Sequence, residues 1–184
     1  PGDHKWIMVD IGVTFADDTI PGIDLIYPDP GFIVERKNNL LGIVLTHAHE
    51  DHIGAIAHLW PQLKCKIFAT PFTSVLIKEK FKEQHIDITS YLNVVQLNGI
   101  VDLDPFKIEY ITLTHSILEP NGLRIETPAG VILHTGDWKI DPEPLIGGKI
   151  NSNRLKEIGN DGVLAMICDS TNVFSMGKAG SELD

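Results

Sequence analysis

The sequence predicts a layered α/β protein, and three observations support this fold class. Short apolar runs rich in branched side chains, the pattern of buried strands, recur along the whole chain. Three segments with helical character lie between these runs, and strands interleaved with helices favour layers packed around a hydrophobic core. The chain has 184 residues, of which 43% are hydrophobic and 22% charged. This composition supports a folded domain and excludes a disordered one.

In the first half of the chain, the apolar runs and the turn residues define seven segments. A Pro-, Gly- and Asp-rich stretch at residues 13–30 is expected to be a loop, with Gly12 and Gly22 as turn points. Helices are predicted at residues 53–60, ended by Pro61, and at residues 71–83. The predicted strands are residues 5–10, 40–45, 66–69 and 91–96.

In the second half, the sequence predicts a hairpin, a helix and a last strand. The hairpin joins residues 123–127 to residues 131–135 through Pro-Ala-Gly. Asn151 or Ser152 is expected to cap a helix that Gly159 closes. Further strands are predicted at residues 106–113 and, as a last buried strand, 163–168.

The cysteines, the apolar runs and the charge limit the functional class. Cys65 and Cys168 adjoin strand-like runs without the spacing of a metal knuckle, so we expect buried, reduced thiols and a cytoplasmic protein. The apolar runs fall far short of the roughly 20 residues that span a bilayer, so no membrane partner is expected. The formal net charge of −10 disfavours a basic nucleic-acid surface, although bound cations would neutralise part of it.

Residues 47–52, His-Ala-His-Glu-Asp-His, contain three of the eight histidines. They directly follow a predicted strand, at the end where α/β proteins commonly place their sites. His47 and His49 are two apart and can point to one side of an extended turn, while Asp51 and His52 follow as a second pair. Imidazole nitrogens and a carboxylate suit two neighbouring divalent ions. The alternative, a polar loop with solvated or helix-capping histidines, fits this spacing less well.

Two ions need more ligands than one loop supplies, and the remaining candidates also stand at strand ends. His115 follows one apolar strand, and Asp137 follows the strand at residues 131–135. Gly136 would let the backbone turn sharply so that the Asp137 carboxylate could bridge both ions. Taken alone, His115 could equally be a strand-end histidine with ordinary partners, but the loop cluster favours a ligand. His134 is expected to orient a neighbouring loop.

These motifs, in this order, resemble those of the metallo-β-lactamase superfamily. Four further short motifs resemble those of the β-CASP nucleases and, within them, of the ribonuclease J family. They are Gly-Ala-Ile at 54–56, Thr-His-Ser-Ile at 114–117, His-Thr-Gly-Asp-Trp-Lys-Ile-Asp at 134–141 and Cys-Asp-Ser-Thr-Asn at 168–172. The resemblance covers essentially the whole chain. It implies a partial αββα sandwich: the first sheet, its helices and part of the second sheet.

The resemblance also implies roles for individual residues. It implies six metal ligands: His47, His49 and His115 on one ion, Asp51 and His52 on a second, and Asp137 between the two. Zinc is the expected metal, with manganese as the alternative. Asp51 or Asp137 would accept a proton from the metal-activated water, and the sequence does not choose between them.

Residues outside the ligand set are expected to support it. Asp10, at the end of the first strand, resembles the superfamily's early aspartate, which holds the metal loop without binding the ion. Asp169 and Ser170 would lie near the phosphate path, and capping of their own loop is an equal alternative.

The ribonuclease J resemblance also implies a longer parent enzyme. We expect residues 1–184 to form the N-terminal portion of a metallo-β-lactamase domain, with the β-CASP insertion and the C-terminal domain absent. The family's late histidine ligand would be absent with them. The uncovered apolar sheet surface of a partial sandwich favours either non-physiological association of this fragment or its origin in a longer chain. The parent enzyme is expected to be a homo-oligomer.

The expected function is metal-dependent hydrolysis of RNA phosphodiester bonds in RNA processing or decay, as a 5′–3′ exonuclease, an endonuclease or both. Two alternatives stay open. A small-molecule metallohydrolase acting on thioesters or lactams would share every ligand. A non-catalytic lactamase-fold module would show a broken ligand set, whereas the expected ligands are present as far as the chain runs.

Overall fold

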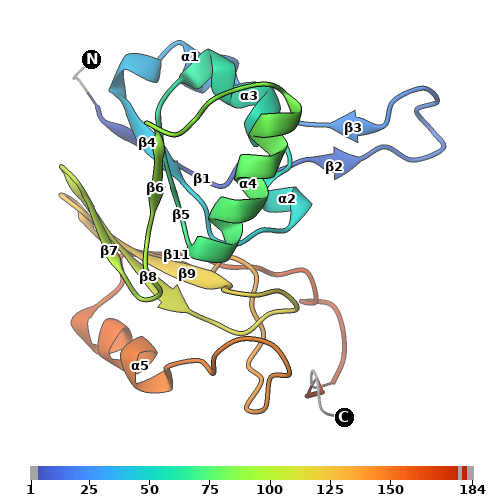
Figure 1. Cartoon of the computed structure of the whole chain (residues 1–184). Helices are drawn as coiled ribbons and strands as arrows, with labels where there is room; N and C mark the ends of the chain where they lie inside the picture. The colour runs from blue at the N-terminus through green and yellow to red at the C-terminus, as the bar shows by residue number, and fades with distance from the viewer. Residues whose placement is uncertain (1–3, 178–179, 182–184) are drawn as a thin grey trace. The chain divides into compact units, whose positions relative to one another are not determined.

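The structure is a computed structural model that describes residues 4–177 and 180–181. The chain divides into two compact units, one ending at Val94 and the other beginning at Val95. We call them the N-terminal unit and the C-terminal unit. Together they contain the mixture of sheets and helices that the sequence predicts, and Figure 1 traces their elements along the chain.

The N-terminal unit is built on a parallel four-stranded sheet in the order β1-β4-β5-β6. Its strands are β1 (Trp6–Val9), β4 (Leu40–Val44), β5 (Lys66–Ala69) and β6 (Leu92–Val94). β4 and β5 are buried along almost their whole length, which is why both read as continuous apolar runs. All four strands confirm the sequence prediction to within two residues at each end.

Helices form the connections between these parallel strands. α2 (Glu50–Ile53) and α3 (Ile56–Leu63) lie between β4 and β5, and α4 (Pro71–Glu83) lies between β5 and β6. Figure 1 shows α3 and α4 side by side. Two short elements, α1 (Gly31–Val34) and the 3-10 helix η1 (Lys37–Asn39), precede β4.

Pro61 does not end the helix, contrary to the sequence prediction. It lies inside α3, which continues to Leu63 and ends at Lys64 in a left-handed conformation. A proline this close to a C-terminus removes one hydrogen bond from the last turn. Trp60 and Leu63, on either side of it, are both almost fully buried, and their packing outweighs that loss.

The segment predicted as a loop contains a small hairpin. β2 (Thr14–Phe15) pairs antiparallel with β3 (Leu25–Ile26). The strands are only two residues long and fully exposed, so they leave no periodic signal in the sequence. In Figure 1 the hairpin projects away from the rest of the N-terminal unit.

The C-terminal unit contains a mixed five-stranded sheet in the order β11-β10-β9-β8-β7. The strands are β7 (Ile100–Leu103), β8 (Phe106–Thr112), β9 (Asn121–Thr127), β10 (Gly130–His134) and β11 (Ala165–Ile167). β9 and β10 form the predicted hairpin. β7 was not predicted. It is a strand of only four residues at the edge of the sheet, too short to give a clear sequence pattern.

Helix α5 (Ser152–Asp161) packs on this sheet through the buried Ile158. The Asn151 side chain caps it by accepting a hydrogen bond from the Arg154 N–H at 3.0 Å, as one of the two predicted caps. The prediction that Gly159 ends the helix was wrong. The helix runs on to Asp161, and Gly162, at φ 93°, supplies the conformation that ends it.

The last strand was predicted to be buried, and this prediction was wrong. β11 is an exposed edge strand that pairs only with β10 among the described strands. Cys168, just after it, is exposed, whereas Cys65 is buried as expected; both are free thiols. Among the described residues, no helix is long and apolar enough to cross a membrane.

The two thiols should therefore differ strongly in reactivity. Burial raises the pKa of Cys65 to about 11, and only the thiolate attacks a disulfide reagent. We expect Ellman's reagent to modify one thiol per native chain quickly and the second only after unfolding. The Cys168→Ser variant should lose the fast phase, and a fast phase that persists in this variant would contradict the assignment.

Candidate metal centre

Residues 46–52, which we call the metal loop, follow β4 in the N-terminal unit, and the last three of them begin α2. β4 is the second strand of a parallel sheet, so the loop starts at its carboxyl edge. Thr46 and His47 are completely buried, His49 is half-buried, and Asp51 lies exposed in the first turn of α2. The buried strand thus feeds directly into a loop whose polar side chains are held in place by packing.

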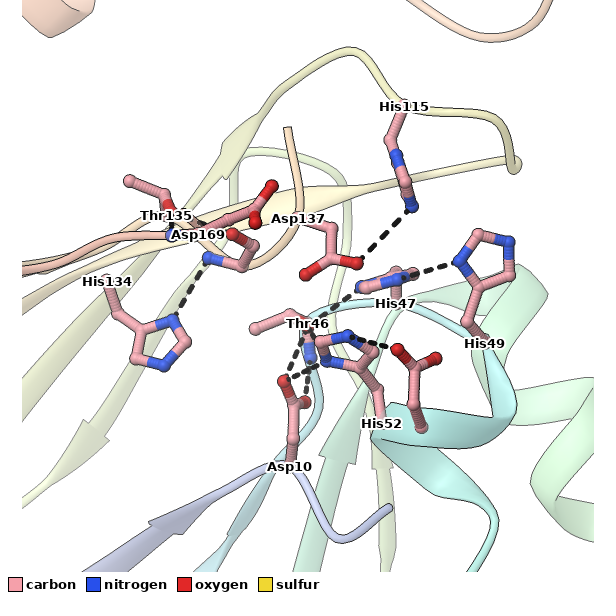
Figure 2. A network of polar contacts seen from close by, with 12 residues as sticks. Asp10, Thr46, His47, His49, His52, His115, His134, Thr135, Asp137 and Asp169 are labelled. Carbon is pink, nitrogen blue, oxygen red and sulfur yellow. Dashed lines mark hydrogen bonds and ion pairs between the residues drawn. The ribbon is translucent and has the colours of Figure 1, made fainter. Parts of the chain in front are cut away.

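The carboxylate of Asp10, which follows β1, anchors the metal loop. Its Oδ1 accepts a hydrogen bond from the Thr46 N–H at 2.7 Å, and its Oδ2 accepts one from the Thr46 hydroxyl at 2.8 Å. Oδ2 also lies 2.7 Å from Nδ1 of His52 (Figure 2). When Nδ1 donates to this carboxylate, the lone pair of His52 is on Nε2 and available to a metal ion. Asp10 therefore fixes both the loop and the tautomer of His52.

The metal loop offers two pairs of ligand atoms at distances that fit metal ions. Nε2 of His47 lies 3.1 Å from Nδ1 of His49, and Nε2 of His52 lies 3.6 Å from an Asp51 carboxylate oxygen. Two ligands bound to one tetrahedral Zn²⁺ at about 2.0–2.1 Å lie about 3.3 Å apart. Both pairs match that separation, and nitrogen and oxygen donors are those that zinc and manganese accept.

A third pair lies in the C-terminal unit. Nε2 of His115 is 3.6 Å from an Asp137 carboxylate oxygen (Figure 2). The loops that carry these residues are tied together by their backbones: the Lys139 N–H donates to the Thr114 carbonyl at 3.0 Å, and the Thr114 hydroxyl donates to the Lys139 carbonyl. Two loops far apart in sequence thus hold a nitrogen and a carboxylate oxygen at a separation that suits one ion.

The turn before Asp137 depends on Gly136 and on His134. Gly136 adopts the left-handed conformation, at φ 55°, which gives the sharp turn expected at this glycine. Its N–H donates to Nδ1 of His134 at 3.0 Å, so the imidazole holds the turn that aims Asp137. The Thr135 hydroxyl accepts a hydrogen bond from the Asp169 N–H at 3.1 Å, which joins this turn to the loop after β11.

Asp169 and Ser170 lie in that loop, at an open cleft of about 690 Å³ that Trp138 also lines. The Asp169 carboxylate accepts hydrogen bonds from the Thr171 N–H at 2.9 Å and the Thr171 hydroxyl at 2.7 Å. The bond from the Thr171 N–H is the main reason that the pKa of Asp169 is lowered. Asp169 therefore shapes its own loop, while Ser170 is exposed at the cleft.

Gly12 contributes to the metal loop in a way the sequence analysis missed. A Cβ atom at this position would lie 1.6 Å from the Asp51 backbone oxygen. The chain after β1 thus passes directly against the first turn of α2, where the Ile11 N–H also donates to the His52 carbonyl at 2.7 Å. The sequence marks Gly12 as a turn residue, but its contact is with residues 39 positions further along.

This contact predicts a specific sensitivity to substitution. Gly12→Ala should displace the turn that carries Asp51 and lower the free energy of unfolding by about 2 kcal/mol or more, because the added methyl has no free space. Chemical denaturation measures the change. The matched control is Gly159→Ala, in the interior of α5 with open space around the added methyl, which should not destabilise the protein. Equal unfolding of the Gly12→Ala variant and the wild type would contradict the assignment.

Comparison with known proteins adds a family to this geometry. The chain is 44% identical to ribonuclease J of Sinorhizobium meliloti over 184 residues, which cover 99% of this chain and 32% of that protein. It is 38% identical to ribonuclease J of Helicobacter pylori over 177 residues, 96% of this chain and 26% of that protein. The chain therefore spans about a third or less of the length of these relatives. The similarity to ribonuclease J expected from the motifs is confirmed.

A solved structure and a family model complete the comparison. A protein of unknown function from Enterococcus faecalis V583 matches with a TM-score of 0.58 and 14% identity, over 97% of this chain and 48% of that chain, which shows likeness of fold alone. The sequence model of the metallo-beta-lactamase superfamily matches residues 2–153. Because this match covers well over half of the sequence, the chain belongs to the metallo-beta-lactamase superfamily.

Proposed function

We propose that this protein is the N-terminal part of a metal-dependent ribonuclease that hydrolyses RNA phosphodiester bonds. The observation that carries the proposal is the metal loop, in which His47, His49, Asp51 and His52 present two ligand pairs at metal-compatible distances. Relatives named ribonuclease J align with nearly the whole of this chain and supply the substrate class.

The proposed centre is dinuclear. The proposed ligands are His47, His49 and His115 for one ion, Asp51 and His52 for the other, and Asp137 for both. The support is the order of these residues in a member of the superfamily and the spacing within each pair. Zinc is the proposed metal and manganese the alternative.

When bound, the ions would lower the pKa of a water molecule and offset the negative charge on the phosphoryl oxygens. The chain's own residues would orient that water and remove its proton. Asp51 and Asp137 are the proposed acceptors, and the side chain of Asp51, at 66% exposed against 28% for Asp137, is the better placed to pass a proton to solvent. Asp10, His134 and Asp169 would act indirectly, by holding the loops that carry the ligands.

The acidic character of the chain is compatible with an RNA substrate if positive charge comes from elsewhere. The ions would supply positive charge at the scissile phosphate. Additional domains, in the part of the longer relatives that this chain does not cover, would bind the rest of the RNA. We propose a cytoplasmic, homo-oligomeric parent enzyme that cleaves as a 5′–3′ exonuclease, as an endonuclease or in both modes. A β-CASP insertion and a C-terminal domain would make up the remaining length.

The double substitution Asp51→Ala with His52→Ala tests this proposal in the whole protein. It removes one ligand pair, so cleavage of 5′-monophosphorylated RNA should fall by at least about a hundredfold, more than the loss of an outer-sphere partner usually costs. His58→Ala is the matched control, because His58 is exposed on α3 and stacks on Tyr27. Turnover retained in the double variant would refute the metal mechanism. If the wild-type protein hydrolyses a thioester but not RNA, that result would instead support the small-molecule hydrolase. If it binds no metal and hydrolyses neither substrate, that result would support the non-catalytic module.

A further inference from the structure

Lys80, on α4, forms an ion pair with Glu50, which lies within the metal loop between His49 and Asp51. The Lys80 ammonium lies 2.6 Å from one carboxylate oxygen of Glu50 and 2.7 Å from the other, so it bonds to both. The Lys80 side chain is only 24% exposed, which is low for a lysine. The pair joins α2 to α4 through two residues that are 30 positions apart in the sequence.

The helix that Glu50 begins has little stability of its own. α2 is four residues long, and its N-cap residue, His49, makes no side-chain cap. A single isolated turn of helix does not persist in water, so its orientation depends on contacts with the rest of the fold. The backbone supplies some of them: the Glu50 carbonyl accepts from the Val13 N–H at 3.0 Å. The bond from Lys80 to the Glu50 side chain adds a contact from α4.

Gly54 makes room for this arrangement. A Cβ atom at Gly54 would lie 2.7 Å from a carboxylate oxygen of Glu50 and 2.5 Å from its backbone oxygen. The Glu50 side chain therefore folds back along α2 toward Lys80.

We propose that Lys80 is a positioning residue for the metal loop. Through Glu50 it fixes the first turn of α2, which carries Asp51 and His52. This inference rests on the proposed metal centre. It assigns no contact between Lys80 and the metal or the substrate.

The alternative is an ordinary surface ion pair. The two cases predict different changes in metal affinity when Lys80 is replaced. Removing an ammonium group near a cation site, by Coulomb's law alone, leaves the affinity for a divalent ion unchanged or raises it. Removing a positioning group lowers the affinity, because the ligands must be ordered when the ion binds. Loss of an outer-sphere partner of a metal ligand typically weakens binding by about 10–100-fold.

The test is a competition titration with a chromophoric zinc chelator at fixed pH, on the protein and three variants. Lys80→Met should bind Zn²⁺ about tenfold more weakly at its weaker site, and Lys80→Arg should restore most of the affinity because it can keep both bonds. Lys82→Met is the matched control: it removes a lysine on the same helix that is 74% exposed and pairs with Glu79. It should bind as the wild type does.

Thermal unfolding in the presence of EDTA verifies that each variant is folded without metal, and Lys80→Gln replaces Lys80→Met if the latter fails to fold. Equal or tighter Zn²⁺ binding by the Lys80 variant would overturn the positioning role while leaving the metal centre standing. A wild type that binds no Zn²⁺ would overturn the metal centre and the positioning role together.

Discussion

The three hydrogen bonds of the Asp10 carboxylate connect the scaffold of the N-terminal unit to its chemistry. Asp10 ends β1 in a left-handed conformation, at φ 60°, and reaches the loop that follows the neighbouring strand β4. It holds the backbone and hydroxyl of Thr46 and the imidazole of His52 with the same two oxygens. The spacing of the proposed metal ligands depends on this contact, because the chain forms no regular secondary structure between Thr46 and His49.

The same principle recurs in the C-terminal unit with different residues. His134 and Gly136 set the turn before Asp137, and the backbone bond from Lys139 to Thr114 ties that turn to the loop of His115. In both units, the side chains proposed to react lie on short loops that directly follow strands. Each of these loops is held by polar contacts to another loop. A metal ion bound there would find its ligands largely ordered before it arrives.

Local sequence patterns predict the buried elements well and the exposed ones poorly. The parallel strand β5 matches its predicted bounds because burial imposes a continuous apolar pattern. Helix α4 also matches its predicted bounds, although its buried side includes Thr73 and Ser74 and Val75 is exposed. The exposed strand β11 contains the same apolar residue types but lies at a sheet edge, so its burial was mispredicted. The metal loop was recognisable because its ligands are close in sequence. The support of the loop by Asp10 was expected from the family resemblance alone. The contacts of Gly12 and Lys80 were not expected, since their partners lie 39 and 30 residues away in the sequence.

The central claim is that histidine nitrogens and carboxylate oxygens of this chain bind a divalent metal ion. X-ray absorption spectroscopy at the zinc edge of the zinc-loaded protein tests it directly, because it reports the ligand atoms themselves. The expected result is a shell of nitrogen and oxygen ligands at about 2.0–2.1 Å with the outer scattering of imidazole rings. A sulfur shell at about 2.3 Å, which would implicate the thiols of Cys65 or Cys168, or a protein that retains no zinc after dialysis, would contradict it.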